Sequence, residues 1–319
     1  MISPTSTYRR AHRSRCTTPG TERAVQDLLR LDPERPRLER IVDAALGGKN
    51  NFTADRDRLI DLMDIAGVPA LHALQAIPCY YQRVIAELSQ LGIDQFVIIG
   101  TGVPTGLPPG QQLHDIARES APSTRVVYIE TDPLVLATAR ATVEPSTDLI
   151  RLLNGDARQP DLVLADPVLN TFIDWRQPVG LILGNLHELE DDEALHTLTR
   201  LRRLMCPGSY LTILQVTLDQ LHPWGCATGH ELIEVVAGIR SPRHCHELTP
   251  LLTGLDLLEP GIVPISHWRP TITPSVPWEP HIAGVYGAVA RLPYRWASYT
   301  EDDSDRPAVT HHWQDPNQS

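Results

Sequence analysis

The sequence lacks any apolar run long enough to cross a bilayer, since none approaches the roughly 20 residues that a membrane-spanning helix needs. Its start lacks the apolar core of a secretory signal. The five cysteines are odd in number, scattered along the chain and without a CxxC pair, which disfavours a disulfide framework and fits a reducing compartment. We therefore expect a soluble cytoplasmic protein.

Basic residues are outnumbered, and the net charge is −11. An acidic protein repels phosphate backbones, so a nucleic-acid partner is not expected and a small-molecule substrate is favoured. One basic cluster, Arg9 to Arg15, falls in a segment rich in Ser, Thr and Pro, and we predict that residues 1–20 form a disordered leader. The sequence leaves the oligomeric state open, a homodimer included.

Several familiar catalytic and metal-binding motifs are also missing. The chain has no G-x-S-x-G elbow and no Walker loop. Histidines and cysteines gather at Cys226, His230 and His244-Cys245-His246, but their spacing fits no common zinc pattern. We expect no metal site.

Hydrophobic residues make up 42% of the chain, which is enough for a sizeable core. The first part of the sequence has helical periodicity, broken by Pro33, Pro36 and the Gly47-Gly48 pair. We predict a helical N-terminal cover over residues 21–92, with helices at 21–31, 38–46, 57–65 and 70–91.

Beyond residue 93 the pattern changes to short apolar runs that alternate with helical segments. This alternation predicts an α/β domain with a doubly wound, mostly parallel sheet over residues 93–296. Strands are expected at 96–99, 125–129, 149–153, 179–183 and 210–216, and a C-terminal antiparallel hairpin at 257–263 and 282–292. Helices are expected at 111–120, 133–140, 191–205, 229–239 and 246–253, and a flexible tail at 297–319.

Three features follow the first three expected strands, at the sheet edge where such folds bind ligands. Gly100-Thr101-Gly102 allows close backbone approach to a ligand, although a plain tight turn also explains it. Glu130 could accept both ribose hydroxyls of an adenosine, or simply begin a helix, whereas Asp132 suits a helix cap. Asp156 could accept from an adenine amino group, or serve as a turn residue. Their order favours a nucleoside-type cofactor, and Asp156 favours S-adenosylmethionine (SAM) over NAD.

With these residues in place, the chain resembles an actinobacterial family of SAM-dependent methyltransferases, formerly domain of unknown function 574. The most specific stretch runs from Leu46 to Arg56, LGGKNNFTADR, which is similar to the family's LGGKDNFxxDR signature. Further matches are Ile99–Thr105, Asp132-Pro133, Leu186-His187, Asp191–Glu193, Pro207–Leu211 and Glu259–Pro264.

The resemblance implies a Rossmann-like class I methyltransferase fold with a seven-stranded sheet, and SAM or S-adenosylhomocysteine (SAH) as the cofactor. It also implies that the Lys49–Arg56 segment lies near the cofactor pocket. We assign His187 and Glu188 as candidate catalytic residues, and Tyr80, Tyr81 and Gln215 as candidate substrate contacts. Packing is the alternative for the tyrosines, and a structural role the alternative for His187. The candidate cofactor-binding residues are Lys49, Asn51, Arg56, Gly100, Thr101, Gly102, Glu130, Thr131, Asp156, Ala157 and Asn185.

The chain departs from the family pattern at four places. Ala44 and Ala45 stand where the family often has two aromatic or aliphatic residues. Ile98 stands where the family usually carries Asp, Leu214-Gln215 stands where it has Ser-His, and the loop from Gly106 to Gln112 is longer. The expected function is SAM-dependent methyl transfer to a small molecule, with secondary metabolism as its setting. The alternatives are a non-methylating reaction on the same fold, such as cyclisation, rearrangement or elimination, and a catalytically inactive sensor or interaction protein. An NAD dehydrogenase is a weaker rival.

Overall fold

The computed structural model describes residues 31–102, 107–108, 110–143, 147–217, 239–270 and 284–294. The helices predicted at 21–31 and 229–239 lie outside these residues except for their last positions, and so do the predicted leader and tail, Cys226 and His230. The proposed domain boundaries therefore stay predictions.

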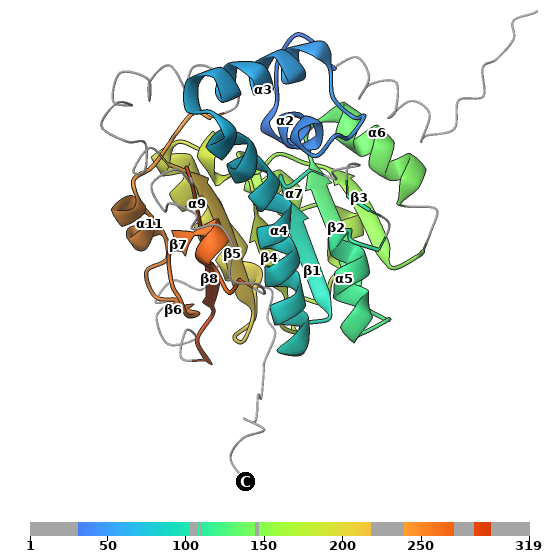
Figure 1. Cartoon of the computed structure of the whole chain (residues 1–319). Helices are drawn as coiled ribbons and strands as arrows, with labels where there is room; N and C mark the ends of the chain where they lie inside the picture. Colours follow the sequence, from blue (N-terminus) through green and yellow to red (C-terminus); the bar gives the residue numbers. More distant parts are fainter. Residues whose placement is uncertain are drawn as a thin grey trace, which may run out of the picture.

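The described residues 31–92 form three helices, α2 (Leu38–Ala45), α3 (Thr53–Ala66) and α4 (Val68–Gln90). Gly47 has φ +75° where the chain leaves α2, and Gly67 has φ +69° between α3 and α4, so glycines mark both turns as their conformational freedom requires. Figure 1 shows α2 and α3 above one end of the sheet, while α4 runs along the sheet. This confirms the helical cover for residues 38–90.

The chain then alternates between strands and helices. The strands are β1 (Gln95–Ile99), β2 (Arg125–Glu130), β3 (Ile150–Asn154), β4 (Gly180–Leu183), β5 (Tyr210–Val216), β6 (Asp256–Leu257), β7 (Val263–Pro264) and β8 (Val285–Arg291). The helices between them are α5 (Leu113–Ser120), α6 (Pro133–Thr142), α7 (Pro160–Leu164), α8 (Pro167–Phe172), α9 (Asp191–Leu204) and α11 (Cys245–Leu251). The described residues also include two short 3₁₀ helices, η2 (Leu186–Glu188) and η3 (Ile265–His267).

The strands form one sheet with the order β3-β2-β1-β4-β5-β8-β6, and β7 also pairs with β8. The five strands from β1 to β5 are parallel, and β8 runs antiparallel to β5, β6 and β7. The predicted mostly parallel sheet with an antiparallel C-terminal hairpin is therefore confirmed. The sheet has eight strands rather than seven, because the expected strand at 257–263 is split into β6 and β7.

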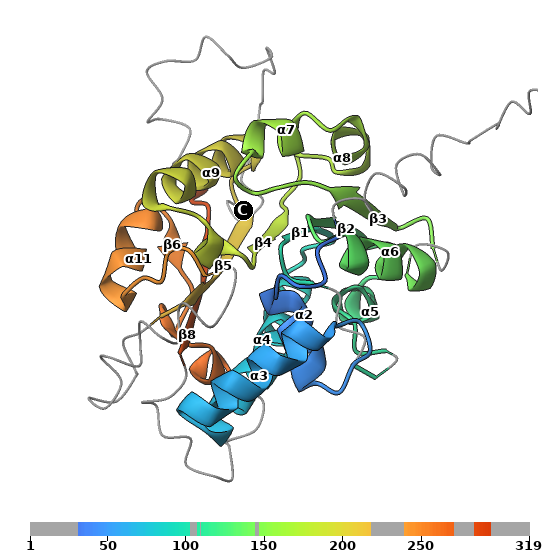
Figure 2. The same ribbon diagram turned by 90° about the horizontal axis from the view of Figure 1, so that it is seen from above.

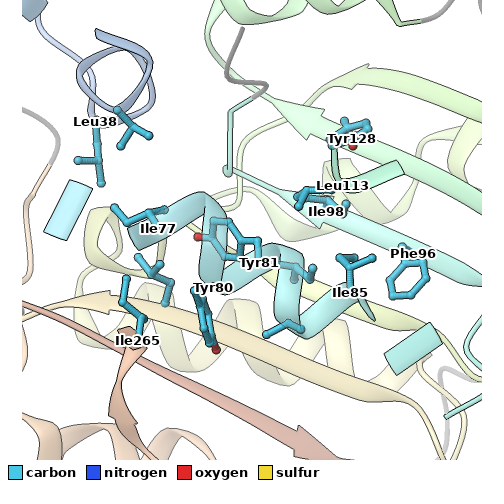
Figure 3. Close-up of a cluster of buried hydrophobic side chains, with 14 of the residues drawn as sticks. Leu38, Ile77, Tyr80, Tyr81, Ile85, Phe96, Ile98, Leu113, Tyr128 and Ile265 are labelled. Atoms are coloured by element: carbon cyan, nitrogen blue, oxygen red, sulfur yellow. The ribbon is translucent and has the colours of Figure 1, made fainter. Parts of the chain in front are cut away.

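Alternate residues of each central strand enter two separate cores, as the two-residue period of a strand requires. Ile98, Tyr128 and Ile182 belong to the core shared with α4 and α5, which Figure 3 shows in part. Val97 and Ile129 belong to the other core, shared with α9 and α11. Figure 2 shows α7, α8 and α9 on the side of the sheet opposite to α4. The result is a three-layer α/β/α fold.

No helix among the described residues is both long enough and apolar enough to span a membrane.

Candidate cofactor site

The glycine turn after β1 requires its glycines. Gly100 has φ +64° and Gly102 has φ +70°, a region that other residues rarely adopt. A Cβ atom on Gly100 would lie 2.3 Å from Cγ of Asn185, which is too close for any side chain. The turn is thus shaped so that the backbone lies directly against the residues at the end of β4.

Glu130, the last residue of β2, holds this turn. Its Oε1 accepts a hydrogen bond of 2.6 Å from the backbone N–H of Gly102, and the residue is 4% exposed. Burial raises the pKa of Glu130 to about 8, partly offset by the hydrogen bond from Gly102. The other carboxylate oxygen can accept from a ligand hydroxyl. Asp132 caps α6, as predicted, since its Oδ1 accepts from the N–H groups of Leu134 and Val135.

A cleft of about 560 Å³ opens beyond the carboxyl ends of β2 and β3. Its walls combine apolar side chains suited to a flat base, such as Leu153 and Leu162, with the polar residues Thr131 and Asp156. Burial raises the pKa of Asp156, but hydrogen bonds and charge from Arg158 outweigh it and hold the pKa below its usual value. The Arg158 side chain reaches both carboxylate oxygens of Asp156, at 2.6 to 3.0 Å. A ligand amine bound to Asp156 would therefore donate to a carboxylate that also accepts from Arg158.

Asn185 and Glu188 stand on the other side of the glycine turn, after β4. Asn185 Nδ2 donates to Glu188 Oε2 at 3.2 Å, and Arg37 of the cover lies 3.8 Å from Glu188 Oε1. Burial raises the pKa of Glu188, against the lowering effects of Arg37 and Asn185. The structure therefore brings Gly100, Asn185 and Glu188 together, as the sequence assignments imply.

His187, between these two residues, is 1% exposed, and neither ring nitrogen has a hydrogen-bond partner among the described residues. Burial, with a smaller effect from the charge of Arg243, lowers its pKa to about 4. The imidazole is therefore neutral at pH 7. It is available to accept a proton, but it is a weak base.

The signature segment Leu46–Arg56 folds back onto α2 and α3. Asp43 of α2 accepts from the backbone N–H of Asn50 and from Nδ2 of Asn51, and Arg56 donates to Oδ1 of Asn51. Lys49 and Arg56 are exposed. These contacts give Asn51 and Arg56 a structural role within the cover, and their assignment as cofactor contacts stays a prediction.

Arg40 of α2 fastens the cover to the sheet. It is 1% exposed, and its guanidinium lies 3.1 Å from Asp55 of α3 and 3.3 Å from Asp132, the residue that caps α6. It also donates to the backbone oxygen of Arg35. This buried network positions α2 above the glycine turn.

Glu39, the neighbour of Arg40 on α2, lies against that turn. A Cβ atom on Gly102 would be 2.9 Å from Cβ of Glu39. Sequence reasoning missed this residue. Acidic residues are common in the first turn of a helix, where they interact favourably with the helix dipole, so Glu39 did not stand out as a ligand contact.

The three candidate substrate residues have different surroundings. Tyr80 donates to the backbone oxygens of Ile213 and Ala288 and packs edge-on against Trp268, which favours the packing interpretation. The side-chain amide of Gln215 is fully hydrogen-bonded. Its Nε2 donates to the backbone oxygens of Val216 and Ser241, and its Oε1 accepts from Arg243. Tyr81 lines a small apolar cavity of about 10 Å³ below the glycine turn, beside Thr101, Gly102, Leu113 and Tyr128.

Ala157 is buried and does not line the cleft, and its backbone oxygen accepts from the Thr197 hydroxyl at 2.7 Å. Among the described residues no group of His, Cys, Asp and Glu side chains could hold a metal ion. His244 and His246 stack with ring centroids 5.5 Å apart.

Similarity to known protein families and solved structures agrees with this geometry. The model of the S-adenosyl methyltransferase family matches residues 24–293. A structure of a protein of the same former unknown-function family, DUF574, from Streptomyces avermitilis MA-4680 is 30% identical, with a TM-score of 0.75, over 83% of this chain and 100% of that one. A methyltransferase candidate from Thermobifida fusca YX is 27% identical, with a TM-score of 0.70, over 82% of this chain and 96% of that one. No curated protein shows significant similarity. The chain belongs to the S-adenosyl methyltransferase family, with SAM as its cofactor.

Proposed function

We propose that the protein transfers the methyl group of SAM to a small molecule. The observation that carries this is the glycine turn held by buried Glu130 beside the 560 Å³ cleft that contains Asp156. These are the groups that an adenosine needs, a carboxylate for the ribose hydroxyls and another for the adenine amine. The residues present therefore fit the cofactor.

The protein has two tasks in such a reaction. SAM supplies a methyl group that is already activated by its positive sulfur, so the chain has to hold the cofactor, align a nucleophile and exclude water. Glu130, Thr131 and Asp156 hold the adenosine half in this proposal. His187 is neutral at pH 7 and its ring nitrogens have no partner among the described residues, so in this proposal it orients a nucleophile by accepting its hydrogen bond. Its lowered pKa makes it too weak a base to take the proton itself.

The cavity available for a substrate is much smaller than the cleft proposed for the cofactor. The cavity next to Tyr81 holds about 10 Å³, which is about the space of one water molecule. Its lining by Val42, Ile77, Leu113 and Tyr128 favours an apolar substrate body, for which the cavity would have to widen. The charge of −11 argues against nucleic acid as the substrate. We place the reaction in the cytoplasm, in secondary metabolism, and leave a homodimer open.

Formation of SAH tests the proposal. The purified protein is incubated with SAM and, separately, with the small-molecule and macromolecular fractions of a bacterial extract. Release of SAH with the small-molecule fraction, together with a product heavier by one methylene, supports the proposal. SAH release with the macromolecular fraction alone contradicts it. Tight SAM binding together with a changed extract component but no SAH would support a non-methylating reaction instead.

A further inference from the structure

We propose that Glu39 of α2 is a cofactor-binding residue whose carboxylate, together with Oδ1 of Asn185, receives the ammonium group of the methionine half of SAM. The inference rests on the proposed function, since it names a further residue of the same site. It assigns to the N-terminal cover a direct contact with the cofactor.

The position of Glu39 is the first argument. Its side-chain stem packs against Gly102, so close that a Cβ on that glycine would be 2.9 Å away. Gly102 donates to Glu130, the carboxylate proposed to hold the ribose. The stem of Glu39, whose Cγ would be 3.3 Å from the same Cβ position on Gly102, therefore lies beside the turn that contacts the proposed ribose carboxylate. Figure 2 shows α2 above the ends of the central strands.

The charges around Glu39 are the second argument. Two arginines flank it in the sequence, but the side chain of Arg37 pairs with Glu188 and that of Arg40 with Asp55 and Asp132. Burial, and then the negative charges of Glu188 and Glu130, raise the pKa of Glu39 well above its ordinary value. The carboxyl groups of Glu39, Glu130 and Glu188 thus lie close enough to repel one another, and the nearby arginines do not fully offset this repulsion. A cation bound between them would relieve this repulsion.

Asn185 is the third and independent argument. It is 4% exposed, and its Oδ1 has no hydrogen-bond partner among the described residues although its Nδ2 is satisfied by Glu188. A Cβ on Gly100 would lie 2.6 Å from this oxygen, so the unsatisfied acceptor faces the glycine turn. A buried acceptor without a donor costs roughly 1–3 kcal/mol, which a ligand N–H would recover.

These acceptors distinguish the two cations of SAM. An ammonium group carries three N–H donors and can satisfy Glu39 and Asn185 together, whereas a sulfonium has no N–H to donate. The strand side offers no alternative, because Ile98 of β1 is apolar and 1% exposed. The carboxylate that the family usually carries on this strand is thus replaced by one from the cover.

The experiment compares Glu39→Gln with the wild-type protein by calorimetry. Two ligands are titrated: SAH, which has the ammonium, and 5′-methylthioadenosine, which has the adenosine and sulfur but no amino-acid part. The matched control is Glu34→Gln, on the same segment with an exposed side chain. Thermal melting of each variant reports whether the fold is kept.

Glu39→Gln should weaken SAH binding roughly 10- to 150-fold, the loss expected for a hydrogen bond to a charged group. Binding of 5′-methylthioadenosine should stay within about two-fold, and Glu34→Gln should change neither ligand by more than that. Unchanged SAH affinity in Glu39→Gln would overturn the inference while leaving the proposed function intact. An equal loss for both ligands would also overturn it, since Glu39 would then only hold the cover in place. If the wild-type protein binds neither ligand, the proposed function itself fails, and the inference with it.

Discussion

Replacement of Arg40 by leucine tests whether the cover is fastened to the sheet as described. The change leaves Asp55 and Asp132 buried without their cation. Removing one partner of a buried ion pair costs about 3–5 kcal/mol. Asp55 keeps the N–H groups of Arg37 and Phe52, and Asp132 keeps those of Leu134 and Val135, so we expect the lower end, about 3 kcal/mol.

For a protein of this size, 1 kcal/mol shifts the melting temperature by roughly 2–4 °C, so Arg40→Leu should lower it by roughly 6–12 °C. Scanning fluorimetry measures this, with Arg35→Leu as the control, because the Arg35 side chain is exposed at the start of the same cover. SAH affinity should fall as well in Arg40→Leu, since α2 would no longer be held above the glycine turn. Equal melting temperatures for the two variants would refute the reasoning, and so would a destabilised Arg40→Leu protein with unchanged SAH affinity.

Three further predictions concern single residues of the site. At pH 9, above the raised pKa of about 8 of Glu130, Glu130→Ala should weaken SAH binding roughly 10- to 150-fold, because hydrogen bonds to a charged group contribute about 1.5–3 kcal/mol; an unchanged dissociation constant in calorimetry would leave Glu130 with only its contact to Gly102. Ile98→Asp should destabilise the protein by several kcal/mol, since the side chain is buried between Tyr128 and Ile182 in the register; a stable variant with tighter SAH binding would show that the site still uses a carboxylate on β1. The pKa of His187 is lowered to about 4, so its stabilising effect is present above pH 6.5, the ordinary value, and is lost as the pH falls toward 4. His187→Gln should flatten this acid decline in melting temperature, and a parallel decline in both proteins would count against it.

Short-range patterns in the sequence predicted most of the elements. The strand at Tyr210–Val216 has the predicted bounds, and the helix predicted at 191–205 lies at Asp191–Leu204. Both have strong local signals, an apolar run in one and an acidic first turn with helical spacing in the other. The short helices α7 and α8 were not predicted, because five or six residues hold too little periodicity to be recognised.

Sequence patterns identified only those site residues that lie directly at or after the end of a strand. Gly102 and Glu130 were identified from their place after consecutive strands, and the structure joins them by a hydrogen bond. Glu39 was missed, since it reaches the site across the fold from α2. Arg158 was also missed, although it lies only two residues after Asp156 and contacts it locally. The signature segment was matched correctly, and its Asn51 donates to Asp43 in the structure. Its assignment as a cofactor contact stays a prediction.

Calorimetry of the wild-type protein with SAM, SAH and NAD tests the central claim most directly. The glycine turn, Glu130 and the cleft with Asp156 predict that SAM and SAH bind and that NAD binds far more weakly or not at all. Tight NAD binding with no response to SAM or SAH would contradict the account.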